Sequence, residues 1–381
     1  MRLPVSERKF RGVALIVSLA LAFGAYASEP GTPLPEPLTL PAALSMADSM
    51  HPDVAAVEAD NATRRAEQLA IEALTGVTTR FDADDRADGM LLEHARQHRR
   101  TKILRCYLGV LLADVTYTLE NEAMAMAYVR MDRGRERHTL GQISDIALAE
   151  RTSRYQAARS QRSAAEAAQR ASRSRLALAL NRPGELATML LPPRLPGNHA
   201  QRPEFEEIET RALNDNTRLQ ALRFRMQAAR QRLEATRRAA DSAPKGDGRE
   251  SDGMISRERV LNAALAGHQA ELARLQGQLD KLQLGVRQAV LDAWLELQTL
   301  YVARQEASDY ADYRDLYLDL SRALYEQEVN ADLGDAMVKT SEARLGSVQT
   351  EFSIAKTWAR IRLLTGTSPE EMSASILGTE P

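Results

Sequence analysis

Cysteine, lysine and aromatic residues are all scarce in this chain of 381 residues, and each shortage excludes a class of protein. Cys106 is the only cysteine, so the chain has no disulfide of its own, and we expect this thiol to be buried and inert. Only six of the 50 basic residues are lysine, and the net charge is −2, so no excess of positive charge favours nucleic acid. Aromatic residues make up 5% of the chain, which is low for the aromatic girdles of a lipid-facing β-barrel.

Catalytic motifs are also missing from the sequence. It contains no glycine-rich phosphate loop, no nucleophile elbow, no zinc-type cysteine pattern and no His-Glu-x-x-His segment. We therefore expect neither an enzyme nor a bound cofactor.

One pair of histidines has the spacing of metal ligands. His94 and His98 are four residues apart, so they would share one face of a helix and hold a soft or borderline metal ion. Arg99 and Arg100 follow directly, and their positive charge disfavours a cation. We prefer two solvated histidines and predict no metal site here.

Acidic and methionine clusters also have a simpler interpretation. Four aspartates suggest Ca²⁺, but they lack the spacing and the glycine of an EF-hand, so we expect a solvated loop. The methionines suggest a copper path, but at helical spacing they usually fill the core. The aspartates are Asp82, Asp84, Asp85 and Asp88, and the methionines are Met46, Met50, Met124, Met126 and Met131.

Residues 1–27 have the three parts of a secretory signal peptide. A basic start precedes an apolar run at residues 13–23, and the small-x-small sequence Ala25-Tyr26-Ala27 predicts cleavage before Ser28. The apolar run is shorter than the roughly 20 residues of a membrane-spanning helix, so an uncleaved anchor is the less favoured alternative. We expect an exported protein of the cell envelope.

Apolar residues recur at helical spacing along two long tracts. One seam steps by three or four residues from Leu104 to Leu119, and a second runs from Leu272 to Leu300. Residues 151–181 are rich in alanine, which favours helix and lets neighbouring helices approach closely. A helix over residues 260–326 would be about 100 Å long, so it must lie in a bundle or tube of similar helices. No segment has the pattern of a strand, and we predict an all-α fold.

The chain divides into two similar halves. The Pro-rich segment 191–197 separates them, which predicts a first helical repeat at 28–200 and a second at 201–381. Three matches occur in the same order in both halves, and they indicate a duplicated unit of long antiparallel coiled-coil helices. Residues 47–56 align with 212–221, 88–90 with 252–254, and 145–149 with 332–336.

Motifs in both halves resemble the TolC-type outer-membrane efflux proteins. Residues 38–44 match the family's Leu-x-Leu-x-x-Ala-Leu entry, and His51-Pro52-Asp53-Val54 is similar to its Asn-Pro-x-Leu step. Gly141 with residues 145–149 resembles the later turn motif, and residues 332–336 repeat it. The ends of the halves, Leu180-Asn181 and Leu364-Thr365-Gly366, are of the Leu-Gly type. The resemblance covers about residues 38–370.

The resemblance implies an assembly and a site. It implies a homotrimer whose helical repeats form a periplasmic tunnel, which works with a periplasmic adaptor protein and an inner-membrane transporter. Acids that ring the tunnel tip would favour cations, although acids at helix starts also cap amides and suit the helix dipole. The implied tip acids are Asp332, Asp335 and Asp145, and the implied adaptor-docking turns contain Gly141, Ser144 and Asn330.

The connections at which the family inserts two β-strands are short here. They span residues 77–90 and 241–254, whereas one membrane-spanning strand needs about 9–11 residues. Both are polar and lack apolar alternation, so we expect a TolC-like helical subunit with little or no β-barrel. Gly334 between the two second-half acids is expected to let the turn bend.

Two functions follow from these expectations. The first is a subunit of an efflux or secretion tunnel, located in the outer membrane by resemblance. The second is a periplasmic scaffold or adaptor-binding protein that keeps the helices and transports nothing itself. Neither hypothesis involves nucleic acid, and the sequence does not identify the transported substrate.

Overall fold

The sequence folds almost entirely into long α-helices. A computed structural model describes residues 33–48, 51–193, 195, 204–242, 257–327 and 332–366. All its helices belong to one unit, Pro35–Pro381, and the other unit is Met1–Leu34. The predicted signal peptide, the boundary between residues 200 and 201, the 252–254 match and Asn330 lie outside the described residues.

The first half has a short helix, an intermediate one, a very long one and a fourth that returns along the third. Thr39 caps the short helix, because its hydroxyl accepts a hydrogen bond from the Ala42 amide at 3.3 Å. The elements are α1 Leu40–Ser45, the 3₁₀ turn η1 Met46–Asp48, α2 Pro52–Thr75, α3 Asp82–Thr139 and α4 Asp145–Ala179.

The second half repeats this order of helices. Its long helix has 70 residues, against 58 for α3, which confirms the uninterrupted helix predicted for residues 260–326. At 1.5 Å per residue the longer helix extends about 105 Å. The elements are α5 Phe205–Asp215, α6 Thr217–Asp241, α7 Arg257–Glu326 and α8 Leu333–Leu364.

The repeat is visible in the residues that begin and end equivalent helices. His51 caps α2 and Asn216 caps α6, and both side chains accept backbone amides of the first turn. Asn181 after α4 and Gly366 after α8 both adopt the left-handed conformation, with φ of 59° and 67°. The aligned motifs therefore occupy equivalent structural positions in the two halves.

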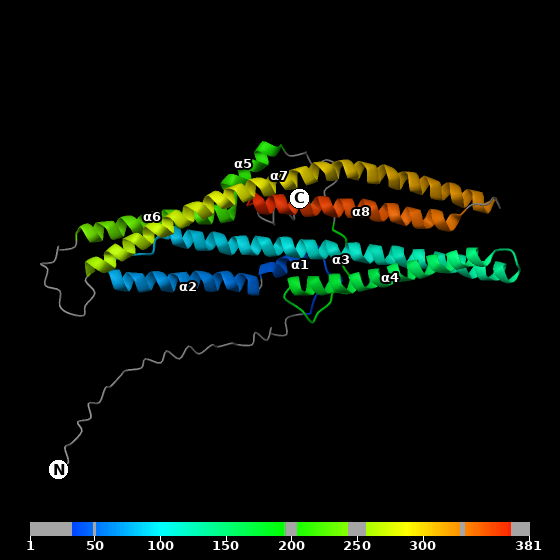
Figure 1. Cartoon of the computed structure of the whole chain (residues 1–381), viewed down its shortest axis with the longest axis horizontal. Helices are drawn as coiled ribbons and strands as arrows, with labels where there is room; N and C mark the ends of the chain where they lie inside the picture. Colours follow the sequence, from blue (N-terminus) through cyan, green and yellow to red (C-terminus); the bar gives the residue numbers. More distant parts are fainter. Residues whose placement is uncertain are drawn as a thin grey trace, which may run out of the picture. The chain divides into compact units, whose positions relative to one another are not determined.

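The helices pack as long antiparallel pairs (Figure 1). α2 and α4 lie one after the other along α3, while α6 and α8 pack against α3 from the second half. In the same way, α6 and α8 lie along α7, and α5 rests on α7. The two halves thus share an interface formed mainly by α3.

The predicted apolar seams form much of the core. On α3, Leu104 and Leu108 are buried, although Val115 of the same seam is exposed. On α7 six seam residues join one buried cluster with residues of α5, α6 and α8, so the helical periodicity correctly predicted the packing face. These six are Leu275, Leu279, Val286, Val290, Ala293 and Leu297.

The prediction of a solvated loop at residues 77–90 was wrong. α3 already begins at Asp82, because the Asp84 carboxylate accepts the Phe81 amide at 3.2 Å and three acids in the first turn suit the helix dipole. Asp84 and Asp88 are buried and paired with arginines of α2 and α6. The connection from α2 to α3 is therefore residues 76–81; the second connection lies mostly outside the described residues.

Strand structure is limited to one isolated bridge in the part of the chain that the structure describes. Leu38 pairs with Leu190, and the buried Tyr107 hydroxyl lies 2.8 Å from the Leu38 carbonyl and 2.7 Å from that of Leu191. These contacts join the segment before α1 to the segment after α4. Among the described helices, none combines the length and the apolar character needed to cross a membrane.

Candidate functional site at the two helical turns

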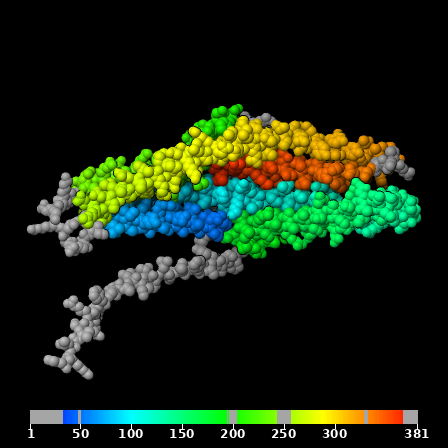
Figure 2. Space-filling view, in the orientation of Figure 1, coloured from blue at the N-terminus to red at the C-terminus, as the bar shows by residue number. Residues whose placement is uncertain are grey.

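The turn between α3 and α4, the end of α7 and the start of α8 lie at the same end of the helical unit (Figures 1 and 2). An ion pair near these turns joins the halves, because Nη2 of Arg130 on α3 lies 2.8 Å from both carboxylate oxygens of Asp332. The ion pair thus joins α3 of the first half to the start of α8 in the second half.

The α3–α4 turn is built by local signals. Gly141 has a φ of 69°, a left-handed conformation that suits glycine, and the Ser144 hydroxyl accepts the Ala147 amide at 3.3 Å to start α4. His138 and Asp145 close the turn with Nε2 and Oδ1 2.5 Å apart. Two apolar side chains are left at this turn, Leu140 at 71% and Ile146 at 82% exposed.

The start of α8 confirms the capping role considered for Asp332. Its carboxylate accepts the Asp335 amide at 3.0 Å. Partial burial raises the pKa of Asp332, but hydrogen bonds from Arg130 and the Asp335 amide outweigh this, so the pKa lies below its usual value. Asp335 lies 3.9 Å from the same guanidinium. Arg130 therefore offsets one of the two negative charges at this turn.

Gly334 has a different role from the one predicted. It lies buried inside α8, and a Cβ there would be 2.0 Å from Cε of Met126 on α3. The absence of a side chain permits close approach of α8 to α3, and the conformational freedom of glycine is not what this position uses. Met126 therefore packs at the contact between the two halves.

The predicted site residues divide into two groups. Asp332 and Asp335 share one arginine, while Asp145 lies in the other turn beside His138. Sequence reasoning missed Arg130 and His138. Arg130 is 202 residues from Asp332, and no local spacing signals that pairing.

A second apolar seam on α7 was also missed. Its residues are exposed, and at about 100° per residue they lie on the side of α7 opposite the buried seam. Their spacings of four, seven and, at one step, fourteen residues are those of a coiled-coil contact face. They are Leu284, Leu291, Leu295, Val302, Leu316 and Leu320.

Aromatic residues continue this face toward the α7–α8 turn. The Arg314 guanidinium lies 5.1 Å from the ring centroid of Tyr310, 5.4 Å from that of Tyr313 and 5.9 Å from that of Tyr317. Its Nε also donates to the Tyr310 hydroxyl at 2.9 Å. These exposed tyrosines are held as one ordered group by the cation at their centre.

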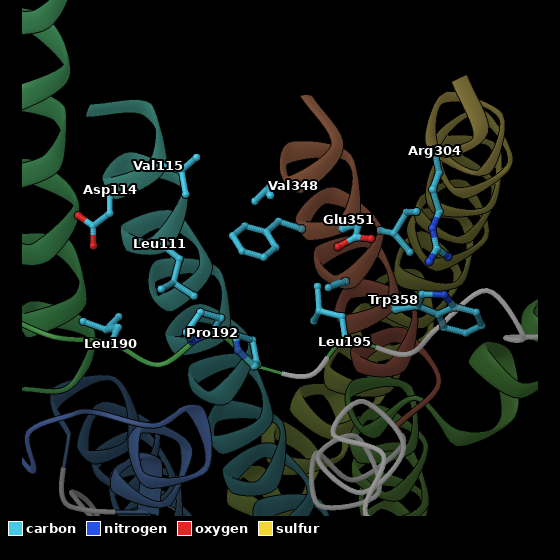
Figure 3. A pocket seen from close by; sticks show the side chains of 14 residues that line it. Leu111, Asp114, Val115, Leu190, Pro192, Leu195, Arg304, Val348, Glu351 and Trp358 are labelled. Carbon is cyan, nitrogen blue, oxygen red and sulfur yellow. The ribbon is translucent and has the colours of Figure 1, made fainter. Parts of the chain in front are cut away.

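A 510 Å³ pocket lies between the halves, where α3 and α8 face each other across the linker (Figure 3). Leu111 and Val115 form one wall, and Trp358 closes the other with its Nε1 donating to the Tyr301 hydroxyl at 3.1 Å. Asp114, Arg304 and Glu351 are the charged residues that line the same pocket (Figure 3). The mostly apolar lining suits an apolar group.

The histidine pair and the aspartate cluster bear on the question of a metal site. Within the described ranges, no group of three or more histidine, cysteine or acidic side chains is arranged to hold a metal ion. His94 faces Thr217 of α6 at 3.1 Å, so this histidine is not solvated as expected. Burial, with help from Arg218 and His98, lowers the pKa of His94 to about 4.

Comparison with solved structures identifies the fold. A membrane protein from Pseudomonas aeruginosa matches with a TM-score of 0.62 at 14% identity, covering 86% of this chain and 90% of that one. The CmeC outer membrane channel of Campylobacter jejuni matches with a TM-score of 0.60 at 10% identity, covering 90% and 87%. The outer membrane protein VceC of Vibrio cholerae matches with a TM-score of 0.58 at 12% identity, covering 86% and 96%.

These matches confirm the predicted resemblance to TolC-type proteins at the level of the fold. The all-α architecture of long helices is that of the helical part of such channels. No protein-family model matches the sequence, and a search of curated proteins also finds no match.

Proposed function

We propose that this chain is a subunit of a TolC-like tunnel that carries efflux or secretion substrates through the cell envelope. The observation that carries the proposal is the shared fold with outer membrane channels over 86–90% of the chain. In this proposal the protein is a passive conduit, exported to the envelope and located in the outer membrane. An inner-membrane transporter supplies the energy, and a periplasmic adaptor connects the two.

The exposed seam on α7 supports a homotrimer. A 70-residue helix with one apolar face in its own core and a second apolar face exposed is only half covered by its own chain. A neighbouring copy that covered Leu291, Leu295 and Val302 would remove this apolar surface from water. Three chains joined in this way would close a tube with both turns at one end.

The α3–α4 turn supports adaptor docking in the same proposal. Leu140 and Ile146 are exposed beside the ordered backbone of Gly141 and Ser144, which gives a partner apolar contacts on a fixed turn. The docking role of Asn330 is proposed from the resemblance alone.

Envelope fractionation followed by native mass measurement tests the proposal. A trimer that enters the membrane fraction and dissociates in the Leu295→Arg variant is expected, because a charge would have to be buried at the subunit contact. Leu74→Arg is the matched control, since Leu74 is exposed on α2 outside this seam. A monomer, or a trimer that the Leu295 change leaves intact, contradicts the proposed assembly.

The periplasmic scaffold is the second candidate, and one observation favours it. Residues 76–81, which join α2 to α3, are fewer than the two-strand insertion that the resemblance implies at this place. Recovery of the wild-type chain as a periplasmic protein that binds an adaptor without conducting ions would support the scaffold over the conduit.

The tip acids are proposed to set ion preference if the tube conducts. Asp332→Asn with Asp335→Asn removes the charge and keeps a capping side chain, so cation preference in a planar bilayer should fall. Arg130→Gln should raise it, because it leaves both acids uncompensated. Unchanged selectivity in both variants would limit these acids to capping.

A further inference from the structure

A second pocket lies between α2 and α7, at the opposite end of α7 from the turns, and we call it the α2–α7 pocket. It has a volume of 490 Å³. Arg64, Arg274 and the buried His268 line it together with apolar residues and with two acids, Glu67 and Glu271. Ile71 and Leu74 are exposed and form part of its wall. The pocket therefore combines cationic groups with an apolar surface.

The floor of the α2–α7 pocket is a fixed network of charges. Nη1 of the buried Arg232 lies 2.9 Å from both oxygens of Asp84, and its Nη2 lies 3.1 Å from Glu271. Gln68 also donates to Asp84 at 3.2 Å. Because Arg232 is fully engaged, this network gives the pocket a rigid base with two acids already neutralised in part.

His268 leaves one nitrogen of the pocket unsatisfied. The side chain is only 5% exposed, and its Nδ1 lies 3.7 Å from the Glu271 carboxylate. Its Nε2 is buried and has no hydrogen-bond partner among the residues that the structure describes. A buried polar atom without a partner costs free energy, so a group in the pocket that accepts from Nε2 would offset this cost.

Three guanidiniums lie around one carboxylate next to Arg64, which lines this pocket. Asp88 accepts from Arg64 at 3.0 Å and Arg65 at 3.2 Å, and a third guanidinium, Arg225, lies 3.9 Å away. Nε and Nη2 of Arg225 are buried and have no hydrogen-bond partner in the described part of the chain. Burial lowers the pKa of Arg225 to about 10, with further lowering by Arg64 and Arg274. An anion would relieve this excess.

We infer that the α2–α7 pocket binds a phosphate group carried by an amphiphilic ligand. Arg64 and Arg274 supply guanidinium donors, and Nε2 of His268 donates a further hydrogen bond in the tautomer that carries its proton there. Ile71 and Leu74 contact the apolar part. Phosphate fits better than carboxylate, because its several oxygens accept from donors on different sides.

Two kinds of phosphate ligand share this chemistry, and calorimetry separates them. The purified full-length chain is titrated with dihexanoyl phosphatidic acid, with inorganic phosphate, and with dihexanoyl glycerol as the uncharged probe. Saturable binding of the phosphatidic acid is expected, and a weaker response to inorganic phosphate assigns the source to a lipid. Equal binding of inorganic phosphate assigns it to a free anion and overturns the part of the inference that requires an amphiphilic ligand. Binding of dihexanoyl glycerol as tight as that of the phosphatidic acid overturns the inference.

Glycine substitutions provide a matched pair of variants. Gly267 lines the pocket and Gly277 does not, and a Cβ at either position on α7 meets nothing within 4 Å. Gly267→Leu should therefore abolish binding by filling the pocket, while Gly277→Leu should bind like the wild type. Both variants should fold, because leucine has the higher helix propensity.

A charge substitution tests the anionic contact separately. Arg274→Gln should weaken binding of the phosphatidic acid about tenfold, the effect of losing one charge-assisted hydrogen bond. Arg287→Gln on the same helix is the control, since Arg287 lies outside the pocket. Absence of saturable binding by either phosphate probe, or binding that persists in Gly267→Leu, overturns the inference.

Discussion

Gly366 is a position at which one methyl group should separate the end of α8 from the junction between α5 and α6. Its φ of 67° is left-handed, and a Cβ there would lie 2.1 Å from the carbonyl oxygen of Asp215 and 3.0 Å from its carbonyl carbon. Asn216 fixes the same junction, because its Nδ2 donates to the Leu364 carbonyl at 2.9 Å. The obstacle is backbone, which cannot swing aside as a side chain can.

Gly366→Ala should therefore destabilise the protein by two effects. The left-handed conformation costs an alanine about 1 kcal/mol, and relieving the backbone clash costs a further 1–3 kcal/mol, so we expect about 2–4 kcal/mol in all. Gly141→Ala is the matched control: its φ is 69°, but a Cβ there meets nothing within 4 Å. It should cost only about 1 kcal/mol.

Urea denaturation of the two variants and the wild type measures both costs. The midpoint should fall much further for Gly366→Ala than for Gly141→Ala. Equal losses would show that only the backbone conformation matters at Gly366, and the argued contact with Asp215 would then be refuted.

Three further predictions concern buried polar groups. The pKa of His94 is lowered from 6.5 to about 4, so the unfolded chain binds a proton at this residue more readily than the folded chain does. The free energy of unfolding should therefore fall by about 1–2 kcal/mol, after solvent screening, as the pH drops from 6.5 to 4. A pH series should show this loss in the wild type but not in His94→Gln. Asp84→Ala should cost about 3–5 kcal/mol in urea denaturation, because it leaves the buried Arg232 without its bidentate partner; a loss below 1 kcal/mol would contradict this. Tyr107→Phe should cost about 1–3 kcal/mol, because the Leu38 and Leu191 carbonyls lose a donor, and an unchanged thermal midpoint would show that water replaces the hydroxyl.

The fold was predictable because its main signal is periodic. Apolar residues at three- and four-residue steps identified the buried face of α7, and the aligned segments 47–56 and 212–221 contain the caps of α2 and α6, His51 and Asn216. Both signals are local in the sequence, since a seam needs only its own helix and a cap needs only its own first turn.

The polar contacts between helices were not predictable in the same way. Asp84 and Asp88 follow a turn in a run of charges, which is a pattern typical of a solvated loop. They are nevertheless buried, and they form ion pairs with Arg232 and Arg64. Arg232 is 148 residues from Asp84 in sequence. The local sequence around a charged residue is the same whether its partner lies across the core or is water. Only the packing of α2, α3 and α6 therefore decides that Asp84 and Asp88 are buried.

The acids at the start of α8 show the same difference between a local contact and a contact with a distant residue. Capping accounts for Asp332 at the start of α8, since its carboxylate accepts the Asp335 amide there whatever the function of the turn. The net charge that a passing ion would meet is set by a residue outside the motif, because Arg130 lies 2.8 Å from Asp332 and 3.9 Å from Asp335. Two homologous turns with identical acids can thus differ in charge through one position on α3. The selectivity of such a tip follows from the pairing of its acids, and counting the acids alone overestimates it.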